Sequence, residues 1–120
     1  MSQRPIESSC VFCRIVAGEE PAHVLRVTDT IVAFRDINPQ APTHILIVPK
    51  EHLLSLAEIQ DRHGEMLADV AQSAAQLARA ENVDGSGWRL VANAGHDAGQ
   101  SVFHLHFHLL GGRRMHWPPG

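Results

Sequence analysis

Hydrophobic and polar positions alternate through residues 103–109. A β-strand projects successive side chains to opposite faces, so this alternation predicts a strand with two unlike faces. The apolar face carries Phe103, Leu105, Phe107 and Leu109. The other face carries His104, His106 and His108, spaced about 7 Å apart. Such a regular apolar face needs a core beneath it, which leaves the histidines on an accessible surface or in a cleft.

Other segments have the β-branched, aromatic or continuous apolar content that favours strands. They are residues 23–28, 30–35, 43–49 and 88–93. The segment 43–49 is apolar on both faces, which predicts a buried central strand. The segment 36–42 contains two prolines and is expected to be a loop.

Helical spacing of apolar residues recurs outside these strands. Residues 10–18 have apolar positions on one helical face and a closing glycine, which predicts a short helix. Residues 54–59 predict a helical turn that Ser55 caps. A longer helix has Asp61 as its candidate N-cap, and residues 82–87 end it. These elements predict an α+β fold with a mainly antiparallel five-stranded sheet, one long helix and a short N-terminal helix.

Composition places the chain among ordinary globular proteins. It has 120 residues, 44% of them hydrophobic and 19% charged. This length predicts a single domain over residues 10–120, with a C-terminal tail at 111–120, after a flexible polar tail at 1–9. A formal charge of -3 gives no electrostatic reason to expect a nucleic-acid partner. No apolar run approaches the ~20 residues that span a bilayer, and residues 1–9 lack the apolar core of a signal peptide, so we expect no membrane partner and a cytoplasmic location.

The histidine row has more than one chemical interpretation. It is either the plain polar face of a strand, a zinc site built from imidazoles at alternate positions, or a phosphoryl-transfer site with a histidine nucleophile. The preceding loop contains Gly95 and Gly99, which permit close backbone approach, and Ser101, which adds a hydroxyl donor. This loop favours phosphoryl chemistry.

The histidine row also resembles a known motif. Residues 104–110 are similar to the signature of the histidine triad (HIT) family, His-x-His-x-His followed by two apolar residues. Residues 33–44, 99–104 and 115–120 resemble the HINT branch, the histidine triad nucleotide-binding proteins. The resemblance runs from about Cys10 to the end of the chain, and it implies a HIT-like fold.

The resemblance implies an enzyme, a purine nucleoside phosphoramidase or a related nucleotidyl hydrolase. His106 would attack the α-phosphorus and form a nucleotidyl-imidazole, which water would hydrolyse to the nucleoside monophosphate. The backbone carbonyl of His104 would fix the tautomer of His106. His108 would hold a phosphate oxygen, and Ser101 would contact the phosphate or donate to the leaving nitrogen. The alternative is a nucleotide-binding scaffold protein whose hydrolysis is incidental.

The resemblance also implies a nucleotide pocket. Asp36 matches the residue that accepts both ribose hydroxyls, although from physics alone a turn residue explains it equally well. The other matching positions are the base-pocket walls Phe34, Ile37 and Val27, the strand residue Asn93, and the phosphate loop Gly99, Gln100 and Ser101. Phe34 and Ile37 also suit core positions, and Asn93 also suits a turn. Arg35 stands where the family often has histidine, and it neighbours the ribose position.

The Cys10-x-x-Cys13 pair is ambiguous by itself: a redox pair, two small buried residues or half of a zinc site. In wider branches of the superfamily a similar pair joins two histidines around zinc, and the matching positions are His52 and His104. The resemblance therefore implies structural Zn²⁺ held by Cys10, Cys13, His52 and His104. His44 is expected to support the triad from the central strand.

The tail 111–120 contains an isolated tryptophan, Trp117. It either packs on the chain's own surface or, as the resemblance implies, reaches the active-site mouth of a partner in a homodimer. A third functional hypothesis is that the triad itself forms a catalytic zinc site. We expect no organic cofactor under any of the three hypotheses.

Overall fold

The structure is a computed structural model that describes residues 9–120. The flexible tail predicted at 1–9 lies outside the described residues except for Ser9, which is exposed. None of the helices within residues 9–120 combines the length and the apolar character that a membrane crossing requires.

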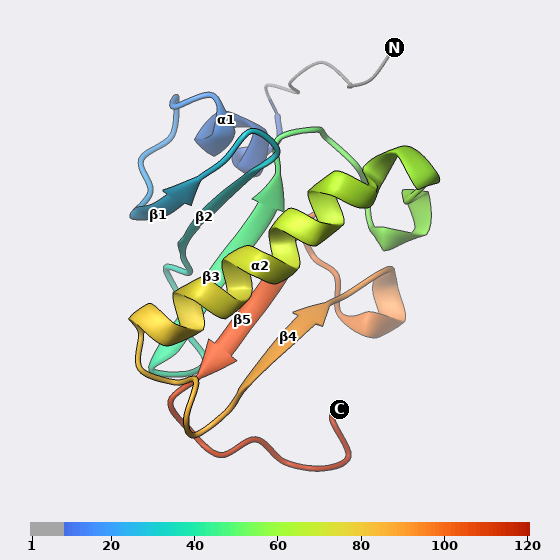
Figure 1. Ribbon diagram of the computed structural model, residues 1–120. Helices are drawn as coiled ribbons and strands as arrows, with labels where there is room; N and C mark the ends of the chain where they lie inside the picture. The colour runs from blue at the N-terminus through green and yellow to red at the C-terminus, as the bar shows by residue number, and fades with distance from the viewer. Residues whose placement is uncertain (1–8) are drawn as a thin grey trace.

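A five-stranded antiparallel sheet lies at the centre, in the order β1-β2-β3-β5-β4 (Figure 1). Its strands are β1 (Val24–Val27), β2 (Ile31–Arg35), β3 (Thr43–Pro49), β4 (Trp88–Ala92) and β5 (Phe107–Gly111). The helices are α1 (Val11–Val16) and α2 (Gly64–Ala80), with 3-10 turns at Leu56–Glu58, Asp61–His63 and His96–Ala98. The predicted α+β fold with one long helix and a short N-terminal helix is confirmed.

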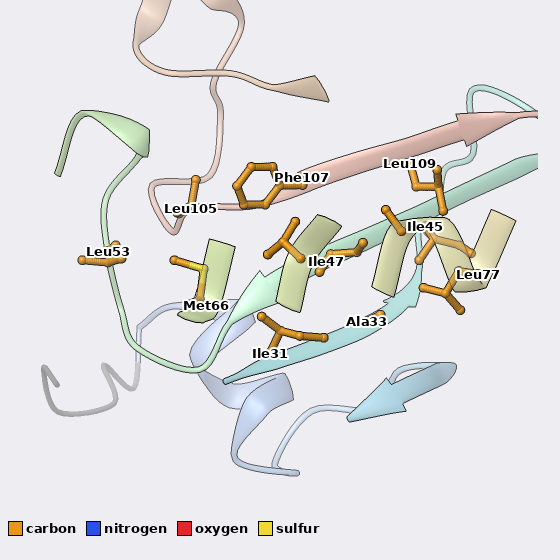
Figure 2. Packing of buried hydrophobic residues seen from close by; sticks show 12 residues of the cluster. Ile31, Ala33, Ile45, Ile47, Leu53, Met66, Leu77, Leu105, Phe107 and Leu109 are labelled. Carbon is orange, nitrogen blue, oxygen red and sulfur yellow. The ribbon is translucent and has the colours of Figure 1, made fainter. Parts of the chain in front are cut away.

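The two helices cover opposite faces of the sheet. Ile45 and Ile47 of β3 belong to a buried cluster that includes Leu77 of α2, and Figure 2 shows these side chains meeting between sheet and helix. Phe12 of α1 belongs to a second buried cluster with Leu46 of β3. Since neighbouring strand residues point to opposite faces, β3 contributes to both cores, and all seven of its residues are buried. The prediction of a buried central strand is therefore confirmed.

The start of the long helix differs from the prediction. Asp61 is not its N-cap, because a 3-10 turn over Asp61–His63 precedes α2 and Gln60 flanks that turn. The ring of His63 stabilises this arrangement, since its Nδ1 accepts a hydrogen bond from the backbone N–H of Gln60 at 2.8 Å. The Ser55 cap is confirmed: its hydroxyl accepts a hydrogen bond from the backbone N–H of Ala57 at 3.1 Å.

The histidine strand also begins later than its sequence pattern predicts. β5 starts at Phe107, so His104 and His106 lie in the preceding segment. There the backbone N–H of Leu105 donates to the carbonyl of Leu53 at 2.7 Å, outside the sheet. Phe103 is 53% exposed and does not join the predicted apolar face. The alternation holds from His104 onward, because Leu105 packs in the α2-side core.

Candidate active site and metal site

A pocket of about 310 Å³ lies between α1, β2 and the histidine segment. This volume is at the lower end of the range for small-molecule sites. The predicted site residues that line it are Phe34, Asp36, Ile37, Ser101, His106 and His108. Its polar groups lie on a mostly apolar wall, so the pocket suits a ligand with a flat apolar part and an anionic or hydroxylated part.

The partner of His106 fixes which of its ring nitrogens carries a proton. Its Nδ1 lies 2.7 Å from the backbone carbonyl of His104. A carbonyl only accepts, so Nδ1 must donate. The neutral ring then has its lone pair on Nε2, the nitrogen that a nucleophile needs. The ring is also held by Phe12, whose centroid lies 5.1 Å away in an edge-on arrangement.

A chain of hydrogen bonds sets the opposite tautomer on His108. The backbone N–H of Gln40 donates to Nδ1 of His44 at 3.0 Å, so the neutral His44 ring carries its proton on Nε2. That nitrogen lies 2.9 Å from Nδ1 of His108 and donates to it. His108 must then carry its own proton on Nε2. His44 thus contacts the triad through His108, and this contact leaves His108 a donor beside His106.

Burial keeps both supporting rings neutral. It is the main cause that lowers the pKa of His108 to about 4, and the neighbouring rings of His106 and His44 lower it further. Burial also lowers the pKa of His44, although the Asp36 carboxylate opposes this effect. At neutral pH the donor at His108 is therefore an uncharged imidazole.

Asp36 makes the turn contact that its sequence context predicts, and it also lines the pocket. Its Oδ1 accepts from the backbone N–H of Asn38 at 2.8 Å, which is the turn contact. Its Oδ2 lies 3.4 Å from Nε2 of His44, and the residue lines the pocket. The turn thus fixes a carboxylate at the pocket wall.

The three triad imidazoles do not converge on one point. Among the described residues, His104 groups with Cys10, Cys13 and His52, whereas His108 groups with Asp36 and His44. His106 belongs to neither group. The interpretation of the triad itself as a single zinc site does not match this geometry.

Arg35 turns its charge away from the pocket. Its guanidinium makes two hydrogen bonds of 2.8 Å to the carboxylate of Glu81, which follows the last turn of α2. The Arg35 hydrogen bond is the main cause that lowers the pKa of Glu81. Although Arg35 lines the pocket next to Asp36, its functional group ties β2 to the end of α2.

Some predicted ligand contacts do not reach this pocket. Val27 is 60% exposed on the edge strand β1 and is absent from the lining, as are Asn93, Gly99 and Gln100. Gln100 instead holds the loop: its side chain accepts from Gly95 and donates to the carbonyl of Leu54. The place of a residue in the sequence next to the triad does not show whether its side chain binds a ligand or stabilises the loop.

The sequence interpretation missed the contribution of α1 and the segment after it. The additional lining residues there are Val11, Phe12, Ile15, Glu20, Pro21 and Ala22. The signal was present in the apolar face of residues 10–18, which we assigned only to packing. The apolar face of a short helix packed on a sheet contacts the core, and the same face can line a pocket at the edge of the helix.

The four predicted metal ligands form a compact cluster. Sγ of Cys13 lies 3.1 Å from Nδ1 of His52 and 3.5 Å from Nδ1 of His104. Sγ of Cys10 lies 3.5 Å from the same His104 nitrogen, and the two histidine nitrogens are 3.1 Å apart. Tetrahedral zinc, with bonds of about 2.3 Å to sulfur and about 2.0 Å to nitrogen, separates its donors by about 3.3–3.8 Å. The donor set and spacing fit zinc.

The outer contact of His104 supports the same fit. Its Nε2 lies 2.9 Å from the carbonyl of Pro49, so it donates and leaves the lone pair on Nδ1 inside the cluster. The ring is completely buried. His104 thus contributes its ring to the Cys–His cluster, while its backbone carbonyl accepts the hydrogen bond from His106.

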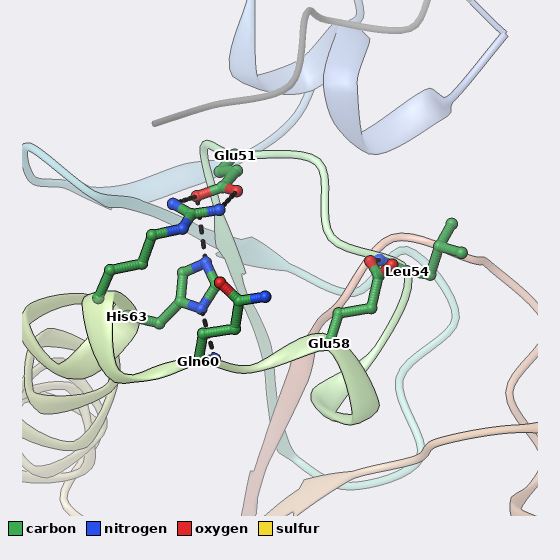
Figure 3. A network of polar contacts seen from close by, with 6 residues as sticks. Glu51, Leu54, Glu58, Gln60 and His63 are labelled. Atoms are coloured by element: carbon green, nitrogen blue, oxygen red, sulfur yellow. Dashed lines mark hydrogen bonds and ion pairs between the residues drawn. The ribbon is translucent and has the colours of Figure 1, made fainter. Parts of the chain in front are cut away.

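A separate ion-pair network holds the segment that carries His52. The Glu51 carboxylate accepts from both terminal nitrogens of Arg62, at 2.7 and 3.1 Å. His63 Nε2 lies 3.4 Å from the same carboxylate, beneath it in Figure 3. The hydrogen bond from Arg62 is the main cause that lowers the pKa of Glu51. This network fixes the connection between β3 and α2.

Trp117 does not pack on the surface of its own chain. Its side chain is 84% exposed, although the tail nearby is tied to β4 by a hydrogen bond from Arg89 to the carbonyl of His116 at 3.1 Å. The tail is therefore positioned while its largest side chain stays uncovered.

Comparison with known proteins gives consistent matches. The family model of the HIT domain matches residues 17–115. The 14 kDa zinc-binding protein of Zea mays is 47% identical over 116 residues, 95% of this chain and 90% of that protein. Adenylylsulfatase HINT1 of Arabidopsis thaliana is 40% identical over 122 residues, 100% of this chain and 82% of that protein. The crystal structure of a HIT family hydrolase from Legionella pneumophila Philadelphia 1 has a TM-score of 0.89 and 50% identity, covering 92% of this chain and 99% of that one.

Proposed function

This chain belongs to the histidine triad (HIT) family, and from its site we propose that it hydrolyses nucleoside phosphoramidates or related nucleotidyl conjugates. The bond cleaved would be the phosphorus–nitrogen bond, and the product a nucleoside monophosphate. The Arabidopsis relative is named an adenylylsulfatase and the Legionella protein a hydrolase, which supports hydrolysis as the type of reaction. The observation that carries the proposal is the pairing of tautomers, a lone pair on His106 Nε2 beside a proton on His108 Nε2.

The reaction would proceed in two displacements. In the first, the Nε2 lone pair of His106 forms a bond to phosphorus while the phosphorus–nitrogen bond breaks. The leaving nitrogen keeps that electron pair and takes a proton relayed by the Ser101 hydroxyl from solvent. His108 donates to a non-bridging oxygen, and the carbonyl of His104 stabilises the positive charge on the nucleotidyl-imidazole. In the second, water attacks phosphorus while the bond from phosphorus to His106 Nε2 breaks. The electron pair of that bond returns to Nε2, and the water proton passes to solvent.

Variants of His106 test this role. We expect His106→Ala to lose adenosine phosphoramidate hydrolysis by at least about a thousandfold and to keep binding AMP. His96→Ala is the matched control, because His96 is fully exposed on a separate 3-10 turn and should retain native activity. Activity of His106→Ala close to the native value would refute the proposal. Binding of AMP without turnover in the native chain would favour the scaffold alternative.

We also propose that Cys10, Cys13, His52 and His104 bind structural zinc. The spacing of the donors and the closed four-ligand set support this, and the name of the maize relative mentions zinc binding. With four protein ligands, the ion would crosslink these segments and would have no open coordination position for a substrate. The residues would connect α1, the β3–α2 connection and the segment before β5, and orient the carbonyl that contacts His106.

A homodimer in the cytoplasm completes the proposal. β4 is an edge strand, and an uncovered edge favours pairing with another strand. The tail lies beside that edge and leaves Trp117 exposed. Pairing of the β4 strands of two protomers would allow Trp117 of one protomer to pack at the pocket of its partner.

A further inference from the structure

One polar side chain in the pocket has no role in the proposed chemistry. Among the described residues, two carboxylates line this pocket, Asp36 and Glu20. Asp36 lies at the histidine end, 3.4 Å from Nε2 of His44. Glu20 comes from the segment between α1 and β1, which also contributes Pro21 and Ala22 to the lining, and Ile15 of α1 lines the same pocket. Glu20 therefore adds a carboxylate to a part of the lining that is otherwise apolar.

Strand pairing places Glu20 beyond the ribose position, on the side away from the histidines. β1 and β2 are antiparallel, and the backbone N–H of Arg35 donates to the carbonyl of His23 at 3.0 Å. One residue further along this pairing, Ala22 comes opposite Asp36, and the bend at Glu20 follows two residues beyond Ala22. Two residues span at most about 7 Å, so Glu20 lies within the length of one ring system of the position opposite Asp36.

The helix on the other wall gives the same order. Phe12 contacts the ring of His106 with centroids 5.1 Å apart. Ile15 follows three residues later, about 4.5 Å further along α1. A nucleotide with its phosphate at the histidines and its ribose at Asp36 would therefore put its base between Ile15 and Phe34, with the outer edge towards Glu20.

We propose that Glu20 reads the outer edge of the base and makes the pocket selective for guanine over adenine. The proposal rests on the proposed nucleotide pocket and adds the identity of the base. A carboxylate accepts hydrogen bonds and donates none. Guanine presents two adjacent donors on this edge, N1–H and the 2-amino group, which match the two carboxylate oxygens. Adenine presents one amino group next to the acceptor N1, which a carboxylate repels.

Glu20 is held ready for this contact. Its Oε1 accepts a hydrogen bond from Nε of Arg14 at 3.1 Å. Its Oε2 has no hydrogen-bond partner among the described residues. The guanidinium of Arg35 does not compensate it, because that group is paired with Glu81. Oε2 can accept from one guanine donor, and Oε1 has a second lone pair beside the Arg14 contact that can accept from the other.

Calorimetric binding of GMP and AMP tests the proposal on the full chain. We expect the native protein to bind GMP about tenfold more tightly than AMP. Glu20→Gln should reverse this order, because an amide offers one acceptor and one donor, the complement of adenine. Glu19→Gln is the matched control, since Glu19 is exposed, lies outside the pocket lining and carries the same charge. This variant should keep the native ratio.

The outcomes separate this inference from the proposed function. Equal affinity for the two nucleotides in the native protein, or an equal change of their ratio in both variants, would overturn the guanine assignment and leave the hydrolase proposal intact. A native preference for GMP that Glu20→Gln reverses would support the assignment even in the absence of phosphoramidate hydrolysis. Failure of the native protein to bind either nucleotide would refute both.

Discussion

At the scale of single residues, the proposed chemistry depends on which ring nitrogen carries the proton in His106 and in His108. His106 and His108 are on the same face of one segment, yet their backbone and ring partners give them opposite tautomers. The alternation of the sequence locates both rings but says nothing of those partners. Gln40 and His44, which determine the proton on His108, are more than sixty positions away from it in the chain.

The position of that proton predicts the effect of changing His44. His44→Phe removes the donor to His108 Nδ1, so both tautomers of His108 become accessible and kcat should fall about tenfold with KM little changed. Nitrogen-15 NMR of the His108 ring would report the mixed tautomer directly. An unchanged tautomer in a folded variant would show that His44 does not set it.

The buried state of His108 predicts a pH dependence of stability. Its pKa is lowered to about 4 in the fold, from an ordinary value near 6.5, so the unfolded chain takes up this proton first as pH falls. Stability should therefore be complete above about pH 6.5 and decrease by about 1–3 kcal/mol towards pH 4. Thermal unfolding of native protein and His108→Gln measures this difference. An equal pH dependence in the two proteins would exclude His108 as the cause.

At the scale of elements, α1 is too short to be stable in isolation. Its six residues are stabilised by packing of Phe12 on the sheet and by the cluster that its two cysteines form with His52 and His104. The resemblance predicted those four ligands together, and the structure brings them together. The sequence alone did not show that α1 also lines the pocket.

Removal of zinc tests this connection between elements. Treatment of the zinc-loaded protein with a chelator should lower Tm by at least about 10 °C, because the donors then lose their common ligand. Hydrogen exchange should rise in residues 10–16 and around His52, and change little in the middle of α2. Cys13→Ala should show the same pattern without chelator. A native metal content near zero after expression with zinc would contradict the proposed site.

At the scale of the whole molecule, the strand pattern predicted the sheet well because every strand packs at least one apolar side chain against the core, including the partly buried Leu25 of β1 and Leu90 of β4. Segment 43–49 is confirmed as β3. Two details escaped prediction for a physical reason. β5 begins late because the backbone of Leu105 is hydrogen-bonded to Leu53, and the guanidinium of Arg35 points away from the pocket because it pairs with Glu81 at the end of α2. Both depend on contacts between distant segments, which local periodicity does not encode.

The proposed dimer belongs to this scale. Light scattering at micromolar concentration should give a mass of about twice the 13.2 kDa of the chain. Deletion of residues 115–120 should preserve that mass and weaken hydrolysis, since the tail would act at the partner's pocket. A monomeric mass would contradict the dimer, and full activity of the shortened dimer would contradict the role of Trp117.

The central claim is that His106 becomes covalently bonded to phosphorus. Rapid mixing of the native protein with an adenosine phosphoramidate, followed by quenching under alkaline denaturing conditions and peptide mass spectrometry, measures this directly. The account predicts an adenylyl group on His106 that forms and decays at rates consistent with turnover and is missing in His106→Ala. Hydrolysis that proceeds at the native rate with no such adduct, or with the adduct on another residue, would contradict it.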